Sequence, residues 1–171
     1  MYGVTIVNAT QAAAYYDQQP KKRVVSWILI FDKNDRVLVV KPSYLEHWLY
    51  PGGGADANEP PITAARRELR AELGVEPDPL RLAYVNYLSP QPTGQNDMVA
   101  FALTTNPVMG DAFLASLQLQ TDEIDEARFV GLDELHHYVG EHRAKPTRTY
   151  VQSHHNHGIC YMEDGTLSVD L

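Results

Sequence analysis

A glycine-rich segment followed by an amphipathic helix places the strongest constraint on this sequence. Residues 50–54 are Tyr-Pro-Gly-Gly-Gly, so the backbone there can approach a ligand closely and adopt positive φ at little cost. Pro60 and Pro61 suit a first helical turn, where the missing N–H would be unpaired in any case. Gly74 stands where a helix can end in a left-handed cap. Between them an apolar stripe recurs at helical spacing, formed by Ile62, Ala65, Leu69 and Leu73.

Two carboxylates leave the same flank of this predicted helix. Glu68 and Glu72 are four residues apart, and residues at that spacing project from one side of an α-helix. Carboxylate oxygens that face a glycine loop suit Mg2+ or Mn2+, since both ions prefer oxygen ligands. The alternative interpretation is a solvated helix whose glutamates and arginines pair along its surface, which is the usual one for an isolated helix.

The spacing of the whole segment decides between these interpretations. Gly53 is followed by five residues and Glu59, then by seven residues and the run Arg-Glu-Leu-Arg-Ala-Glu-Leu-Gly-Val at residues 67–75. This pattern resembles the Nudix box, Gly-x5-Glu-x7-Arg-Glu-U-x-Glu-Glu-x-Gly-U, in which U is a bulky aliphatic residue. Every fixed position matches except one, because Ala71 stands where the first glutamate of the pair is expected. A spaced pattern of this length in a loop–helix context is specific.

The resemblance covers residues 53–75 directly, and the flanking strand pattern extends it to about residues 24–140. It implies an α/β fold, a Nudix-type α/β/α sandwich with a mixed sheet. It also implies metal-dependent hydrolysis, by water, of the pyrophosphate bond in a nucleoside diphosphate linked to another moiety. The alternative is a Nudix-fold nucleotide-binding or regulatory module that is catalytically weak or inactive.

The resemblance further implies roles for individual residues. The catalytic set is Glu59, Arg67, Glu68 and Glu72, and the ligands to Mg2+ or Mn2+ are Glu68, Glu72 and a carbonyl of Gly53. Arg67 and Glu59 pair to fix the helix against the loop. The general base is either a box glutamate or an acid from residues 122–126.

Ala71 removes one carboxylate from this set. We therefore expect weaker metal binding or fewer metal ions with the chemistry retained, because Mg2+ usually keeps several waters. Candidates for substrate binding are Trp48, Tyr87 and Glu123. Trp48 could equally pack in the core. The identity of the substrate stays open, since specificity in this family lies in loops outside the box.

Composition limits the partners. A chain of 171 residues suits one domain. Its formal net charge of -8 argues against a nucleic-acid polymer as partner and leaves a small nucleotide-type substrate, since a bound metal can reverse the local charge. The longest apolar run, near residues 24–31, is far too short to span a membrane, and we see no signal peptide. We expect a cytoplasmic protein.

The rest of the chain is predicted to surround this segment within the single domain 1–171, as an N-terminal extension 1–23, a core 24–140 and a C-terminal extension 141–171. Expected strands lie at residues 2–7, 24–31, 36–41, 80–88, 98–104 and 127–130, with a hairpin at 159–169. Expected helices lie at 11–19, with Thr10 as its cap, and after the turn at 131–135; residues 111–119 suit a helix or a strand edge. Residues 121–126 suit an acidic turn.

The terminal hairpin could pair with the N-terminal strand or with a second subunit, so a homodimer is one option. Cys160 should point inward with Met162 and stay buried. The histidines 154, 155 and 157 lack the pattern of a closed zinc site.

Overall fold

A six-stranded sheet and a two-stranded sheet organise the part of the chain that a computed structural model describes, residues 8–76, 78–90, 96–105, 109–153 and 159–170. The helices are α1 (Ala9–Asp17), α2 (Pro61–Leu73), α3 (Asp111–Ser116), α4 (Leu135–Val139) and α5 (Glu141–Ser153). The strands are β1 (Arg23–Leu29), β2 (Val37–Pro42), β3 (Gly52–Gly54), β4 (Leu80–Leu88), β5 (Met98–Thr105), β6 (Ile124–Val130), β7 (Cys160–Glu163) and β8 (Thr166–Asp170).

The larger sheet is mixed, as predicted. Its strand order is β3-β1-β5-β4-β7-β8. The pairs β1–β5 and β4–β7 are parallel, and the other neighbours are antiparallel. The short glycine strand β3 therefore forms one edge of the sheet, which leaves it accessible to a ligand.

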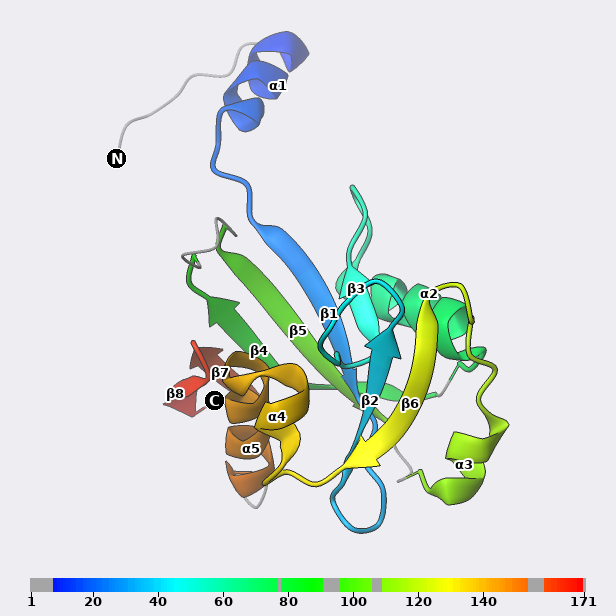
Figure 1. The fold of residues 1–171 in the computed structure, drawn as a ribbon. Coiled ribbons are helices and arrows are strands. Elements are labelled where there is room, and N and C mark those ends of the chain that lie inside the picture. Colours follow the sequence, from blue (N-terminus) through cyan, green and yellow to red (C-terminus); the bar gives the residue numbers. More distant parts are fainter. Residues whose placement is uncertain (1–7, 77, 91–95, 106–108, 154–158, 171) are drawn as a thin grey trace.

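The side chains of β1 alternate between the two faces of this sheet, and helices cover each face. Val25, Trp27 and Leu29 belong to a core cluster shared with α4 and α5, whereas Ile28 packs in a second cluster with α2. Successive side chains of a strand point to opposite faces, so one strand supplies both cores. Figure 1 shows α4 and α5 on one side of the molecule and α2 on the other. The α/β/α sandwich predicted from the sequence is confirmed.

Helix α2 follows its predicted boundaries closely. Pro61 is its first residue, and Gly74 ends it in a left-handed conformation with φ 67°. The buried residues are Ala64, Ala65, Leu69 and Leu73. Ile62 was expected in this apolar stripe, but its side chain is 49% exposed. The stripe starts two residues later, because Ile62 lies in the first turn and faces away from the sheet.

The strand predicted at residues 36–41 was expected to return beside the preceding one. Instead β2 pairs along its length with β6 in the second sheet, from Val37–Val130 to Pro42–Ile124. It meets the residues just after β1 more briefly, through a bridge between Phe31 and Val37 and a 2.9 Å hydrogen bond from the Leu38 N–H to the Ile30 carbonyl. The turn between them is held by Asp32, whose carboxylate accepts backbone N–H groups and pairs with Arg36. Both faces of β2 are buried, so periodicity alone could not assign its partner.

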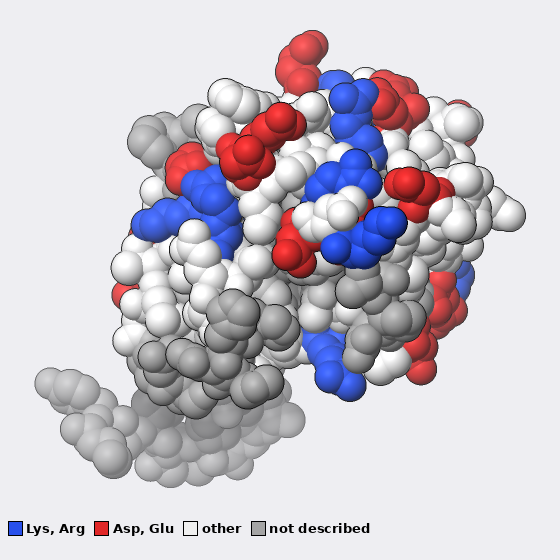
Figure 2. All heavy atoms as spheres, turned by 90° about the horizontal axis from the view of Figure 1, so that it is seen from below, with Lys and Arg blue, Asp and Glu red and all other residues white. Residues whose placement is uncertain are grey.

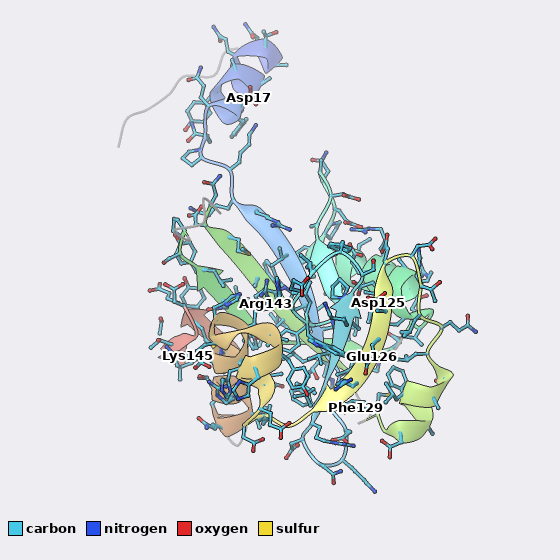
Figure 3. All side chains as sticks on the ribbon, in the orientation of Figure 1. Asp17, Asp125, Glu126, Phe129, Arg143 and Lys145 are labelled. Atoms are coloured by element: carbon cyan, nitrogen blue, oxygen red, sulfur yellow. The ribbon has the colours of Figure 1, made fainter. Side chains whose placement is uncertain are left out.

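Two local expectations change in the structure, and a third, which left a helix or a strand edge open, is resolved as a helix. Asn8, not Thr10, caps α1, because the Asn8 side chain accepts the Gln11 N–H at 3.0 Å. Residues 111–119 contain the helix α3. The acidic turn ends at Glu123, and Figure 3 shows Asp125 and Glu126 already on β6.

The C-terminal hairpin finds its partner within the chain. β7 pairs with β4 through Tyr84–Cys160 and the residues that follow. Cys160 and Met162 are buried, as predicted. The strand expected at residues 2–7 and the histidines at 154, 155 and 157 lie outside the described residues.

Helix α5 was not foreseen, and it completes the core on the face opposite α2. Its Thr147 Oγ1 lies 2.8 Å from the Tyr50 hydroxyl and 3.2 Å from the Tyr84 hydroxyl. Helix α1 stands apart from the sandwich in Figure 1, and none of its residues is buried. Within the described residues, no helix is long and apolar enough to cross a membrane.

Candidate active site

The carboxylates of α2 lie directly against the glycine strand. Glu72 Oε2 accepts the backbone N–H of Gly52 at 2.9 Å. A Cβ atom added to Gly53 would lie only 2.6 Å from Glu68 Oε1. Gly52 itself has φ 126°, and a side chain there would meet the Ser26 carbonyl. Gly52 therefore has to be glycine, the absence of a side chain at Gly53 leaves room for the Glu68 carboxylate, and both acids face the same short segment.

Arg67 ties the start of this helix to the same strand. Its guanidinium donates to both oxygens of Glu59, at 3.0 and 2.9 Å, and to the Gly54 carbonyl at 3.2 Å. It also donates to Glu68 Oε1 at 2.7 Å. The hydrogen bonds from Arg67 and from the Asp56 N–H lower the pKa of Glu59 to about 2. Glu59 therefore stays charged and holds the fork of Arg67 in one orientation.

Glu72 differs from Glu59, because its surroundings raise its pKa instead of lowering it. Burial raises the pKa of Glu72 to about 8, and the charges of Glu68 and Glu123 add to the rise against the Gly52 hydrogen bond. A buried acid beside other acids is uncharged near neutral pH unless a cation joins it. The site is thus built for a positive charge that the described side chains do not supply to Glu72.

The acidic turn after α3 is fastened to the end of α2. The Gln120 N–H donates to the Glu72 carbonyl at 3.1 Å, and the Ser43 N–H donates to the Glu123 carbonyl at 2.9 Å. The charges of Glu72, Glu123 and Glu68 all act on the exposed Tyr44, whose pKa is raised, first by burial of its hydroxyl. Glu123 is therefore the acid of residues 122–126 whose charge reaches the site.

The donor chemistry of this site fits a divalent cation. Two carboxylates on one helix flank lie against the glycine strand β3, and Mg2+ and Mn2+ prefer oxygen ligands. Among the described residues, no three side chains of His, Cys, Asp or Glu are grouped closely enough to hold a metal ion. One reason is that Glu68 Oε1 is turned to Arg67, so a cation would compete with that contact.

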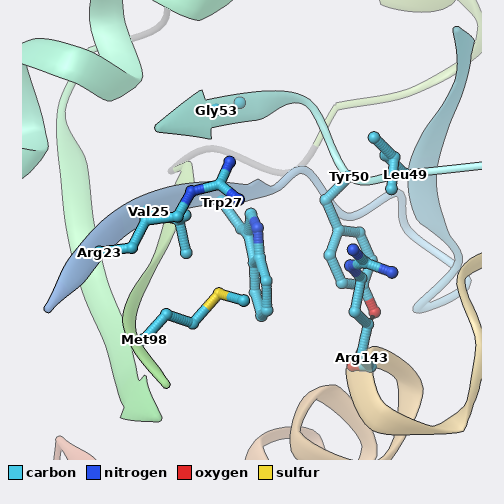
Figure 4. Close-up of a pocket in the computed structure, with 9 residues that line it drawn as sticks. Arg23, Val25, Trp27, Leu49, Tyr50, Gly53, Met98 and Arg143 are labelled. Atoms are coloured by element: carbon cyan, nitrogen blue, oxygen red, sulfur yellow. Dashed lines mark hydrogen bonds between the residues drawn. The ribbon is translucent and has the colours of Figure 1, made fainter. Parts of the chain in front are cut away.

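A pocket opens on the other side of β3, with a volume of about 100 Å3. Figure 4 shows the Trp27 ring extending into it between Met98 and Tyr50. The Trp27 and Tyr50 ring centroids are 6.2 Å apart. Two guanidinium groups border the pocket, from Arg23 on β1 and Arg143 on α5. Gly52 and Gly53 line the pocket and also lie against the Glu72 and Glu68 carboxylates, so the pocket and the carboxylate site share the edge strand β3.

The three residues predicted to bind substrate lie in different places. Trp48 packs edge-on against Tyr138 at 5.6 Å, with the Arg128 guanidinium 4.6 Å from its ring. The Tyr87 hydroxyl donates to Asp97 at 2.9 Å. Neither residue lines the pocket described above, and Glu123 lies on the carboxylate side.

Sequence reasoning missed Trp27 and Arg143. Residues 24–31 were predicted as a strand, but no pattern showed that Trp27 borders an open pocket. Arg143 lies in α5, which contains Pro146 and therefore did not look helical.

The fold and the glycine–carboxylate junction together define a Nudix-type domain. The family model described as "NUDIX domain" matches residues 20–150, more than half of the 171 residues. The chain belongs to the NUDIX domain family.

Solved structures of this family have the same fold. The MutT protein from Methanosarcina mazei Go1 superposes with a TM-score of 0.63 at 17% identity, covering 80% of this chain and 99% of that one. The MutT NUDIX hydrolase from Burkholderia pseudomallei gives a TM-score of 0.59 at 22% identity, with 78% and 98% covered. At these identities the likeness establishes the fold alone.

Curated relatives match over shorter segments. An RNA pyrophosphohydrolase from Hydrogenovibrio crunogenus is 38% identical over 55 residues, 32% of this chain and 33% of that protein. A diphosphoinositol polyphosphate phosphohydrolase 3-alpha from Mus musculus is 37% identical over 67 residues, 39% of this chain and 41% of that protein. The chain therefore spans less than half the length of these relatives.

Proposed function

We propose that this protein is a metal-dependent hydrolase of a phosphoanhydride bond in a nucleoside diphosphate linked to another moiety. The observation that carries the proposal is the contact of Glu68 and Glu72 with Gly52 and Gly53. The names of the H. crunogenus and M. musculus relatives describe hydrolysis of diphosphate groups, which supports the reaction class. A small nucleotide-type substrate, without a nucleic-acid polymer or membrane as partner, and a cytoplasmic location belong to the same proposal. A homodimer stays a prediction.

Glu68, Glu72 and a carbonyl of Gly53 would hold Mg2+ or Mn2+. The bound ion would supply charge neutralisation at the nonbridging oxygens of the diphosphate and would lower the pKa of the attacking water. Arg67 positions Glu68 and the Gly54 carbonyl through direct hydrogen bonds. Glu59 holds Arg67 in turn, so its role is positioning.

Glu123 supplies the negative charge that Ala71 lacks. Its turn is bonded to the end of α2 and to Ser43, and its charge raises the pKa of Glu72. The proton of the attacking water passes to a site carboxylate, either Glu123 or a box glutamate, since the charges of Glu68 and Glu123 both reach Glu72.

The alternative is a binding or regulatory module on the same fold. The chain keeps Glu59, Arg67, Glu68 and Glu72 together, and their network would have no purpose in a module that binds nucleotide without metal. The enzyme is therefore the better-supported function.

A phosphate-release screen tests the proposal. The compounds are nucleoside triphosphates, nucleotide sugars, ADP-ribose and dinucleotides, each with Mg2+ and with Mn2+. Glu72→Gln should lose at least about a hundredfold in activity, as expected when an interaction with developing charge is removed. Glu76→Gln is the matched control, because Glu76 pairs with Arg70 just beyond the same helix, at 2.5 Å. Nucleotide binding without turnover of any compound would instead support the binding module.

A further inference from the structure

The pocket between β1 and α5 holds two arginines without a carboxylate partner. Within the described part of the chain, six other arginines have a carboxylate oxygen within 4.0 Å, namely Arg36, Arg66, Arg67, Arg70, Arg128 and Arg148. Figure 2 shows one face of the molecule, on which most of the blue Lys and Arg side chains lie beside red Asp and Glu side chains. Arg23 and Arg143 have no such ion pair among the described residues, in a chain of net charge -8. Arg81 on β4 also has no ion pair among the described residues, but it is exposed, so the distinguishing feature of the pocket is that two such guanidinium groups border one cavity.

Arg143 is also incompletely hydrogen-bonded. Its Nη1 donates to the Val139 carbonyl at 3.3 Å, whereas its Nε is buried without a partner among the described residues. Burial lowers the pKa of Arg143, and the charge of Arg23 lowers it further against the effect of Tyr50. The charge of Arg23 thus reaches Arg143 across the pocket. A buried donor without an acceptor and two cations in repulsion are both relieved by an anion.

The size and walls of the pocket favour a compact group over a nucleobase. Its volume of about 100 Å3 is well below the roughly 300–1,000 Å3 of pockets for larger ligands. The Trp27 ring is 8% exposed, and the Arg143 guanidinium already lies 5.8 Å from its centroid. A base therefore has little free ring surface to stack on. Guanidinium groups, in contrast, match phosphate oxygens in a two-pronged geometry.

We infer that this pocket binds a phosphate group of the substrate that lies outside the hydrolysed diphosphate. The inference rests on the proposed function and adds a substrate class to it, a diphosphate whose other moiety carries a further phosphate. Gly52 and Gly53 connect the two places, because they touch Glu72 and Glu68 and also line the pocket. β3 is an edge strand, so a substrate can pass around it with the diphosphate at α2 and the second phosphate at Arg23 and Arg143.

The test uses inorganic phosphate as the probe and the intact chain in excess chelator. Without divalent metal, the carboxylate site repels phosphate, so calorimetry reports the arginine pocket. Arg143→Gln and Arg23→Gln should each weaken phosphate binding by about tenfold or more, because hydrogen bonds to charged groups are among the strong ones. The phosphate affinity of Arg143→Lys should lie between those of the parent and of Arg143→Gln, since lysine keeps the charge and loses the planar fork of the guanidinium.

Arg81→Gln is the matched control, because Arg81 is exposed on β4 and has no ion pair among the described residues. Its phosphate affinity should equal that of the parent. Arg23 lies at the exposed start of β1, so its variant folds even if a change at Arg143 disturbs α5. Equal phosphate affinity in parent and Arg23→Gln, or an equal loss in Arg81→Gln, would overturn the inference.

The result is separable from the proposed function. Phosphate binding that depends on both arginines, in a protein that hydrolyses no compound of the screen, contradicts only the hydrolase. Hydrolysis of a screened compound by a protein whose phosphate binding ignores both arginines contradicts only the pocket inference.

Discussion

Glu72 Oε2 accepts a 2.9 Å hydrogen bond from the backbone N–H of Gly52, twenty residues earlier in the chain. This contact joins the middle of the site to the edge strand of the sheet. It favours the charged carboxylate, but burial outweighs it and the pKa of Glu72 rises to about 8. The acid is therefore protonated near neutral pH in the metal-free protein and must lose that proton before it can bind a cation.

Metal-free stability should consequently fall as the pH rises. The pKa of Glu72 is about 8 in the folded protein against an ordinary value of 4.5. The folded state holds the proton more tightly, so its stabilising contribution is complete below about pH 4.5 and is lost as the pH rises through about 8. In chelator, the free energy of unfolding should fall between about pH 5 and pH 9 more steeply in the parent than in Glu72→Gln, by a few kcal/mol in all.

The check is a set of chemical denaturation curves for both proteins across that pH range. All other carboxylates are shared, so the difference between the two slopes reports Glu72. Parallel pH profiles would show that Glu72 is ionised normally in the folded protein.

Gly53 offers a test of the metal site that leaves the fold intact. A Cβ at this position would displace the end of the Glu68 side chain, since it would lie 2.6 Å from Oε1. Gly53→Ala should keep its melting temperature, because a flexible side chain can move, while Mn2+ affinity falls by about tenfold to a hundredfold. Gly54→Ala is the control: its Cβ would come no nearer than 3.8 Å to Arg23. Calorimetric titration should separate the two variants, and identical Mn2+ affinities would place the ion away from Glu68.

The sequence predicted this part of the site because its chemistry is local. Residues 52–54, Arg67, Glu68 and Glu72 lie within one strand–loop–helix unit, so their spacing fixes which side chains meet. Even there, Ile62 was predicted to belong to the apolar stripe but is exposed, since a residue in the first turn of a helix can lie outside the buried face. The predicted mixed sheet and α/β/α layers followed from the family resemblance that this local pattern carries.

The rest of the site depends on contacts that no local pattern contains. Trp27 and Arg143 meet across the pocket although β1 and α5 lie at opposite ends of the chain. Pro146 lies inside α5, so that segment was not predicted to be helical. Both faces of β2 are buried, so its sequence did not indicate that it pairs with β6. Pairing and convergence of this kind are set by the whole core, which a one-dimensional sequence pattern does not specify.

Thr147 should contribute strongly to the free energy of unfolding, because it lies in the core beside the pocket. Its hydroxyl lies within hydrogen-bond distance of the Tyr50 and Tyr84 hydroxyls, and Tyr84 is fully buried. Thr147→Val keeps the shape but leaves the Tyr84 hydroxyl without this partner, which should cost about 1–3 kcal/mol. Thr149→Val is the control, because Thr149 lies in the same helix, is only half-buried and makes one 3.3 Å bond to the Gly165 carbonyl. Urea unfolding that shows equal losses for both variants would contradict the importance of the buried pair.

A last prediction concerns Ala71, where the box pattern has a glutamate. It tests whether a third carboxylate can come from position 71 or already comes from Glu123. Ala71 is exposed on α2, next to Glu72, so Ala71→Glu introduces no steric conflict. Without metal the added charge should repel its neighbours and lower the melting temperature. With Mn2+ the order should reverse, since an ion that binds only the folded state stabilises it in proportion to its occupancy.

Glu123 decides what this variant means. If Glu123 supplies the missing charge, Glu123→Gln should weaken Mn2+ binding about tenfold or more, as changes around a metal site do, and Ala71→Glu should restore it in that background. Thermal melts of the parent, both single variants and the double variant across a Mn2+ titration measure this cycle. A double variant that binds Mn2+ no better than Glu123→Gln would show that residue 71 does not reach the ion. Glu123→Gln with parental affinity would instead remove Glu123 from the site and leave Glu68 and Glu72 as its only carboxylates from the described residues.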